Sequence, residues 1–373
     1  MAGIYIHIPF CKQACHYCDF HFSTSLNKRD AMLGAICKEL ILRKEELTQP
    51  IETIYFGGGT PSLLTPQEID FVLQTVYDNF TVVDTPEITL EANPDDLTDA
   101  KITALASSKI NRLSIGIQSF FEEDLKLMNR AHNQTEALDC ITKAKQYFKN
   151  ISIDLMYGIP QMSPQRWQEN IEKALSLEVP HISCYVLTVE PKTALERFIK
   201  NGIIRPVDDA VAARHHAVLV EKTAAVGYHN YEFSNFCIPG WESQSNSSYW
   251  MRKPYLGVGP SAHSYDVVSR SWNVSNNPRY IKSIEKGVLP LTTEILTTEN
   301  QYNEYIMTRL RTAGGVSIDE IGAFFGLKFQ EYLKQNMQQH IALGLLICEG
   351  DVIKATKKGK FLTDGIAADL FMI

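Results

Sequence analysis

The sequence lacks an apolar run long enough to cross a membrane, an excess of positive charge and a secretory leader. No apolar stretch among the 373 residues approaches the ~18 that a membrane span needs. With 36 Lys and Arg against 43 Asp and Glu, the chain also lacks the concentrated positive charge of a general nucleic-acid binder. The first residues show no basic segment followed by an apolar core, so we expect a cytoplasmic protein.

The eight cysteines are unevenly spread along the chain. A long chain without a leader is not expected to use them as a disulfide framework. Three of them crowd into residues 11 to 18, which predicts a shared centre. Small, buried apolar side chains are the expectation for the others, Cys37, Cys140, Cys184, Cys237 and Cys348.

Alternating strand and helix patterns fill the first two thirds of the chain. The β-rich runs are Ile4–Ile8, Thr53–Phe56, Glu87–Glu91, Arg112–Gln118, Ile151–Met156 and His181–Leu187. Helices are predicted between them, and two have clear start signals, at Thr65-Pro66 with Glu68 and at Ser163-Pro164. Such alternation predicts parallel βαβ units that form either an open doubly wound sheet or a full or partial barrel.

Polar clusters follow several of these predicted strands. They include Gly57–Thr60, the segment from Glu91 to Pro94, and Asp154 to Pro160. Because α/β folds gather their chemistry at the carboxyl ends of parallel strands, we expect one shared site within an α/β domain of residues 1–235.

Two further units are expected beyond residue 235. Residues 236–284 are rich in Ser, Asn and Trp and predict an irregular connector or an extra edge element. Residues 285–373 show helix, helix, helix and a short hairpin, the pattern of a winged-helix module. Residues 286 to 373 hold nine Lys and Arg and ten Asp and Glu, so we expect a protein-contact or lid role rather than DNA binding.

The spacing Cys11-x3-Cys15-x2-Cys18 lies in a loop directly after the first strand. Three thiolates on a four-iron cube leave one iron open, and an open iron can chelate a cofactor. The alternative is a zinc site in which His16 or His21 completes a tetrahedron, as in a regulatory protein that binds DNA through its C-terminal module.

At these residues the loop resembles the cluster loop of the radical S-adenosylmethionine (SAM) superfamily, and Gly57–Thr60 after the second strand strengthens the likeness. The resemblance implies a partial (β/α)6 barrel of the TIM type with a winged-helix-like C-terminal domain, a [4Fe–4S] cluster on the three cysteines, and reductive cleavage of SAM. The opening Tyr5 to Cys11 resembles oxygen-independent coproporphyrinogen oxidases and their relatives. In that group the positions that contact SAM match Tyr5, Tyr17, Gly58, Gly59, Thr60, Glu91, Gln118, Arg130 and Asp154.

Within that group, Asp19-Phe20 after the third cysteine resembles the HemW branch of haem chaperones, because the decarboxylating oxidases carry a further cysteine there. The resemblance implies haem as cargo, haem-acceptor proteins as partners, an electron donor and a homodimer. Oxidative decarboxylation of coproporphyrinogen III is the alternative activity.

One motif of that branch is altered in this sequence. HemW proteins carry His-Asn-x-x-Tyr-Trp, a segment associated with haem, and this chain has Ser245 in place of the histidine. Serine is not a usual axial ligand of haem iron. Cys237, Tyr249 and His263 are the candidate replacements, each with a packed, hydrogen-bonded role as the alternative.

Overall fold

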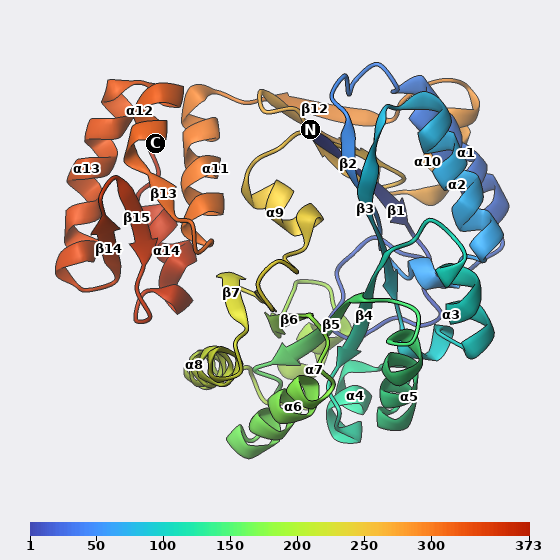
Figure 1. Ribbon diagram of the computed structural model, residues 1–373, viewed down its shortest axis with the longest axis horizontal. Helices are drawn as coiled ribbons and strands as arrows, with labels where there is room; N and C mark the ends of the chain where they lie inside the picture. Colours follow the sequence, from blue (N-terminus) through green and yellow to red (C-terminus); the bar gives the residue numbers. More distant parts are fainter.

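The computed structural model describes residues 1–373 and centres on one curved sheet (Figure 1). Its first six strands are parallel and lie in chain order. They are β1 (Ala2–Ile8), β2 (Ile51–Gly58), β3 (Val82–Ala92), β4 (Arg112–Gln118), β5 (Asn150–Tyr157) and β6 (His181–Val186).

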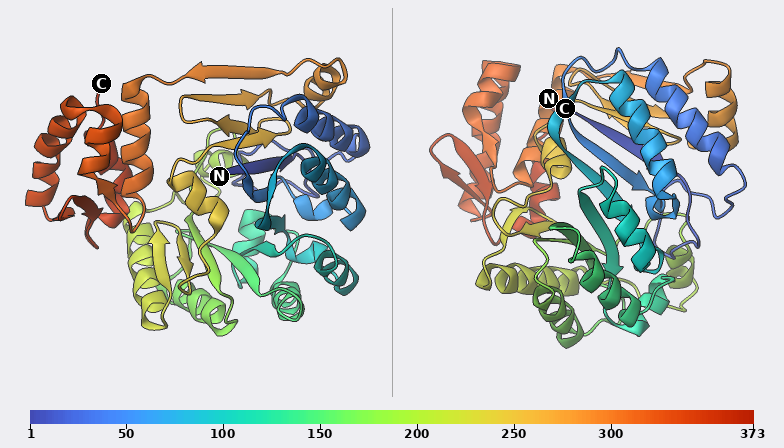
Figure 2. Two further views of the ribbon diagram at one scale, coloured as in Figure 1. Left: turned by 45° about the horizontal axis from the view of Figure 1, so that its top comes forward. Right: turned by 45° about the vertical axis from the view of Figure 1, so that its right-hand side comes forward.

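Helices connect these strands and cover the outer side of the sheet (Figures 1 and 2). They are α1 (Arg29–Leu42), α2 (Pro66–Asn79), α3 (Asp99–Ala106), α4 (Glu122–Met128), α5 (Gln134–Ala144) and α6 (Pro164–Ser176). The start signals are confirmed: the Thr65 hydroxyl accepts from the Glu68 amide in a full capping box, and Ser163 caps α6. Strands in chain order, curved and open, confirm the predicted partial barrel.

Six more strands extend the sheet at its two ends. β8 (Asn235–Cys237) pairs antiparallel with β6, and β7 (His229–Glu232) pairs with β8. On the other side β9 (Tyr255–Val258) runs parallel to β1 and is followed outward by β10 (His263–Tyr265), β11 (Ser269–Asn273) and β12 (Leu291–Ile295). β7 and β12 are the two ends of this twelve-stranded sheet, which does not close.

Residues 236–284 therefore contain regular elements that add to the sheet edge. Besides their strands they hold α9 (Gln244–Trp250) and α10 (Asn277–Glu285), while α7 (Ala194–Lys200) and α8 (Asp209–Ala225) precede them. Gly259 has φ of +100°, and a Cβ there would lie 2.5 Å from the His7 carbonyl oxygen of β1. Only glycine lets β9 end so close to its neighbour.

A buried polar network ties this extension to α1. Arg43 donates to Glu39 at 3.0 Å and to the Gly257 carbonyl at 2.9 Å, and both charged side chains are almost fully buried. The second Glu39 oxygen accepts from Tyr280 of α10 at 2.6 Å. One hydrophobic core accordingly runs from Ala2 to Ile284.

The C-terminal unit has its own core, from Tyr302 to Met372. Its elements are α11 (Thr298–Leu310), β13 (Val316–Ser317), α12 (Ile318–Phe325), α13 (Leu327–Ala342), β14 (Leu346–Glu349), β15 (Val352–Ala355) and α14 (Thr363–Asp369). The Ser317 hydroxyl caps α12 by accepting from the Glu320 amide, and the order of elements is that of a winged helix. The unit docks on the edge strand β7, where the Ala313 amide donates to the Tyr231 carbonyl at 2.9 Å (Figure 1).

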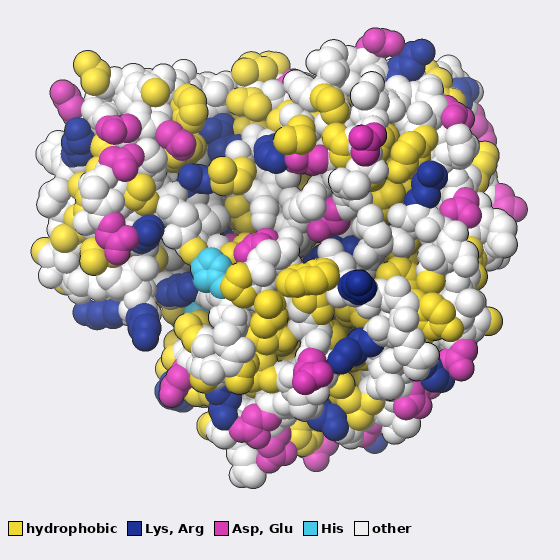
Figure 3. Space-filling view, in the orientation of Figure 1, with side chains coloured by type: hydrophobic (Ala, Val, Ile, Leu, Met, Phe, Trp, Pro, Cys, Tyr) yellow, Lys and Arg dark blue, Asp and Glu magenta, His cyan; other side chains and the backbone are white.

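The surface agrees with the absence of a basic stripe in the sequence. On the face shown in Figure 3, acidic and basic side chains are interspersed over both units. No helix of the protein is both long and apolar enough to span a lipid bilayer.

Candidate functional site

The loop that carries the three cysteines is anchored on several elements. The Cys11 amide donates to the Ser23 carbonyl at 3.1 Å, which closes the loop on itself. The His16 amide donates to Met128 at the end of α4 at 3.0 Å, and the His16 carbonyl accepts from Leu195 of α7 at 2.8 Å. The loop is therefore held in place by the barrel.

The three thiols are free, partly exposed and open to one cavity. Burial raises the pKa of Cys11 to about 11 and that of Cys18 to about 12. The Arg130 guanidinium lies 3.4 Å from the Cys15 sulfur. Burial disfavours the free thiolates of Cys11 and Cys18, whereas bound iron stabilises a thiolate, and the three cysteines fit a cluster with three thiolate ligands.

The zinc alternative finds no support in the geometry. No three His, Cys, Asp or Glu side chains converge as the ligands of a single ion must. The His16 ring is hydrogen-bonded to the Leu127 carbonyl at 2.8 Å, and the His21 ring to Asn277 at 2.7 Å. A four-iron cube spreads its ligands over different iron atoms, so it does not need such convergence.

The glycine turn after β2 packs directly on the end of β1. Gly58 has φ of +103°, and a Cβ there would lie 2.5 Å from the His7 ring. The Gly59 amide donates to the Ile8 carbonyl at 2.9 Å. This close approach places the turn beside the cysteine loop and leaves its open side to the cavity, as expected for a backbone that contacts a ligand.

A cavity of about 590 Å³ lies next to the cysteines. All but one of the predicted SAM contacts line it. They are Tyr17, Gly58, Gly59, Thr60, Glu91, Gln118, Arg130 and Asp154. The exception is Tyr5, whose hydroxyl lies 3.2 Å from the His7 ring nitrogen and whose ring stacks on Tyr55. Tyr55 does line the cavity, so Tyr5 lies one side chain behind its wall.

Two carboxylates of the cavity have raised pKa values. Burial raises the pKa of Glu91 to about 7, although its oxygens accept from the Tyr55 hydroxyl at 2.8 Å and the Gly58 amide at 3.2 Å. Burial also raises the pKa of Asp154 to about 6, although its carboxylate accepts from the Ser114 hydroxyl at 3.4 Å. Both groups change charge near neutral pH, a common property of functional carboxylates.

Arg130 and Gln118 complete this wall. Arg130 donates to the Asn93 side chain at 2.7 Å and to the Gly116 carbonyl at 2.8 Å, which fixes the guanidinium between β3 and β4. Gln118 ends β4 with φ of +67°, so the chain turns sharply at the cavity.

Other cavity residues were not predicted. Arg112, Ser114 and Gly116 line the cavity beside the predicted Gln118, because alternate residues of a strand face the same side. Since Gln118 was a predicted site residue, counting back along β4 in steps of two could have identified Arg112 as a cavity residue. Arg311 and Asp364, which form an ion pair of 2.8 Å, reach the cavity from the C-terminal unit, and no local pattern indicated them.

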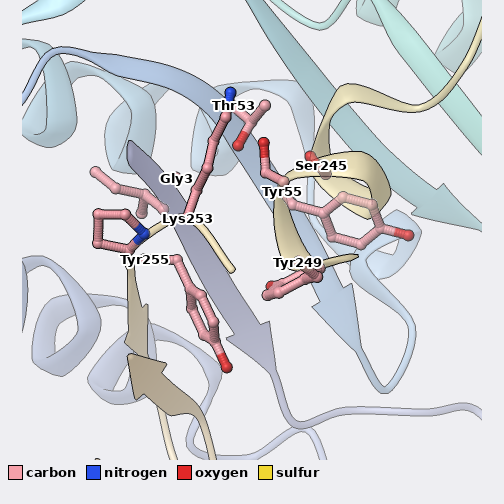
Figure 4. A pocket seen from close by; sticks show the side chains of 10 residues that line it. Gly3, Thr53, Tyr55, Ser245, Tyr249, Lys253 and Tyr255 are labelled. Carbon is pink, nitrogen blue, oxygen red and sulfur yellow. The ribbon is translucent and has the colours of Figure 1, made fainter. Parts of the chain in front are cut away.

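The segment with Ser245 forms α9, which packs on β1 and β2 (Figure 4). Ser245 and Tyr249 line a void of about 10 Å³, the space of one water molecule and far too small for haem. The Ser245 hydroxyl has no hydrogen-bond partner there. The next residue, Asn246, lines the large cavity.

The candidate haem ligands lie in different surroundings. Cys237 is fully buried in β8, and Tyr249 is partly buried. His263 is exposed and stacks on Trp272 at 5.9 Å between ring centres. Of the three, His263 is the one that a ligand can reach without movement of the chain.

Comparison with known proteins decides the family. Residues 5–174 match the Radical SAM superfamily and residues 296–362 match the HemN C-terminal domain. The heme chaperone HemW of Bacillus subtilis (strain 168) is 34% identical over 367 residues, with 97% of each chain covered. The chain belongs to the HemW family of radical SAM proteins. HemW of Lactococcus lactis subsp. lactis (strain IL1403) is similar as well, at 32% identity and 97% coverage of both chains.

The fold has a solved counterpart. Coproporphyrinogen III oxidase (HemN) from Escherichia coli, described as a radical SAM enzyme, superimposes with a TM-score of 0.84, covering 100% of this chain and 90% of that one. At 22% identity this likeness establishes the fold. Membership of the radical SAM superfamily implies a [4Fe–4S] cluster and SAM, in agreement with the cysteine loop and the glycine turn.

Proposed function

We propose that this chain is a haem chaperone that binds haem and passes it to acceptor proteins, with a [4Fe–4S] cluster on Cys11, Cys15 and Cys18. The observation that carries the proposal is its similarity to heme chaperones over 97% of both chains. The loop supports it too, because Asp19 and Phe20 follow Cys18 where the decarboxylating oxidases have a further cysteine.

The cavity offers suitable surroundings for both cofactors. A reduced cluster with bound SAM would supply one-electron chemistry, for which an electron donor is required. Around it, Gly58, Gly59 and Thr60 present backbone groups, Glu91 and Asp154 accept hydrogen bonds, and Arg130 offers a cation. We assign SAM binding to these residues together with Tyr5, Tyr17 and Gln118.

Haem binding tests the proposal directly. Haem titrated into the anaerobically reconstituted protein should change its absorption spectrum, and the loaded protein should pass haem to an apo-haemoprotein on mixing. A dimer that forms on loading would appear as a larger species in light scattering.

The second candidate is oxidation of coproporphyrinogen III, which the fold of the E. coli enzyme favours. Anaerobic incubation with coproporphyrinogen, a reductant and SAM separates the two. No protoporphyrinogen should form, and its appearance together with failure to bind haem would contradict the chaperone function.

A further inference from the structure

Arg112 is a buried cation whose hydrogen-bond donors are incompletely matched within the protein. It is the first residue of β4, is 2% exposed and lines the large cavity. Its Nε has no hydrogen-bond partner. The Glu87 carboxylate lies 3.8 Å away, beyond hydrogen-bonding distance, and its two oxygens accept from the first amides of α9 at 3.1 and 3.0 Å.

Neighbouring strands repeat this pattern at the same level of the sheet. Thr89 of β3 and Asn150 of β5 are the register partners of Arg112. The Thr89 hydroxyl and the side-chain amide oxygen of Asn150 are buried without a hydrogen-bond partner as well. Buried polar groups are almost always satisfied, and a buried charge without hydrogen bonds is costly. Of the three residues, Arg112 alone lines the cavity, so its guanidinium marks the place where an anionic ligand group would bind.

This place lies at the far end of the cavity from the cysteines. Arg130 connects the Cys15 sulfur to the Gly116 carbonyl, so Gly116 marks the cysteine end of β4. Arg112 precedes Gly116 by four residues, roughly 13 Å along a strand. A carboxylate of SAM that chelates the open iron does not reach that far, so a carboxylate at Arg112 has to come from a second ligand.

We propose that Arg112 binds a carboxylate of this second ligand, a propionate of the tetrapyrrole. A guanidinium pairs with a carboxylate through two parallel hydrogen bonds, which satisfies its donors. Asn246 of α9 lines the same cavity, so the segment that replaces the family's haem-associated motif borders this site. The inference rests on the proposed function, because it takes haem as the cargo.

The test compares haem with haem dimethyl ester, in which both propionates are esterified. Each is titrated into the wild-type protein, Arg112→Gln, Arg112→Lys and the control Arg279→Gln, which changes an exposed arginine of α10. SAM affinity is measured in parallel, with iron content and circular dichroism as checks of folding. A charge-assisted pair predicts that Arg112→Gln weakens haem binding about tenfold or more.

The expected pattern is specific. The ester should bind the wild-type protein more weakly than haem, and Arg112→Gln should remove that preference while SAM affinity stays within about twofold. Arg112→Lys should fall between, and Arg279→Gln should match the wild type.

Equal binding of haem and ester by the wild-type protein would overturn the inference without any variant. Unchanged haem binding in Arg112→Gln would also overturn it, and would leave water as the partner of Arg112. A loss of SAM affinity instead of haem affinity in Arg112→Gln would overturn it as well. If the wild-type protein binds no haem at all, the proposed function itself fails.

Discussion

Glu91 should make SAM binding depend on pH. Its pKa of about 7 results from burial, so the side chain is about one tenth ionised at pH 6 and about nine tenths ionised at pH 8. If the carboxylate binds a polar group of SAM, affinity should rise about tenfold over this range, or about 1.4 kcal/mol. Asp154, with a pKa of about 6, should add about a factor of two.

Equilibrium binding at several pH values measures this effect, with Glu91→Gln as the decisive variant. The ammonium group of SAM also titrates, and it contributes equally to the pH dependence of binding by the wild type and by Glu91→Gln. The wild-type protein should therefore show about tenfold more pH dependence than Glu91→Gln, and Glu172→Gln on the exposed side of α6 should match the wild type. Identical pH profiles for the wild type and Glu91→Gln would refute a role for the Glu91 charge.

Three stability predictions follow from backbone and network geometry. Gly58→Ala should lower the free energy of unfolding of the cofactor-free protein by about 2–4 kcal/mol, because φ is +103° and the new Cβ overlaps the His7 ring. Gly34→Ala in α1, where a Cβ meets nothing within 4 Å, should instead stabilise by about 0.5–1 kcal/mol in urea unfolding. Glu39→Gln should cost about 3 kcal/mol, because it removes the buried counter-charge of Arg43 and leaves only the exposed Glu46. Glu46→Gln changes the exposed partner of the same arginine. Equal urea-unfolding midpoints for Glu39→Gln and Glu46→Gln would contradict that reasoning.

Local signals predicted the barrel strands and helix starts well. The run Arg112–Gln118 is β4 to the residue, and His181–Leu187 exceeds β6 by one residue. These signals suffice because buried parallel strands are short apolar runs and helix caps act within a few residues. The cysteine spacing likewise needed no long-range information.

Long-range features were not visible in the sequence. β9 pairs with β1 across about 250 residues of chain, and its four residues give no periodicity to detect. Arg311 and Asp364 reach the cavity because the C-terminal unit docks on β7, a contact between surfaces and not a local pattern.

The central claim is a four-iron cluster with an open iron on Cys11, Cys15 and Cys18. The most direct test is iron and acid-labile sulfide content with electron paramagnetic resonance of the anaerobically purified, reduced protein, before and after SAM is added. We expect about four iron and four sulfide per chain, a spectrum that shifts with SAM, and loss of both in the three Cys→Ser variants. Zinc without sulfide, or a cluster whose spectrum ignores SAM, would contradict it.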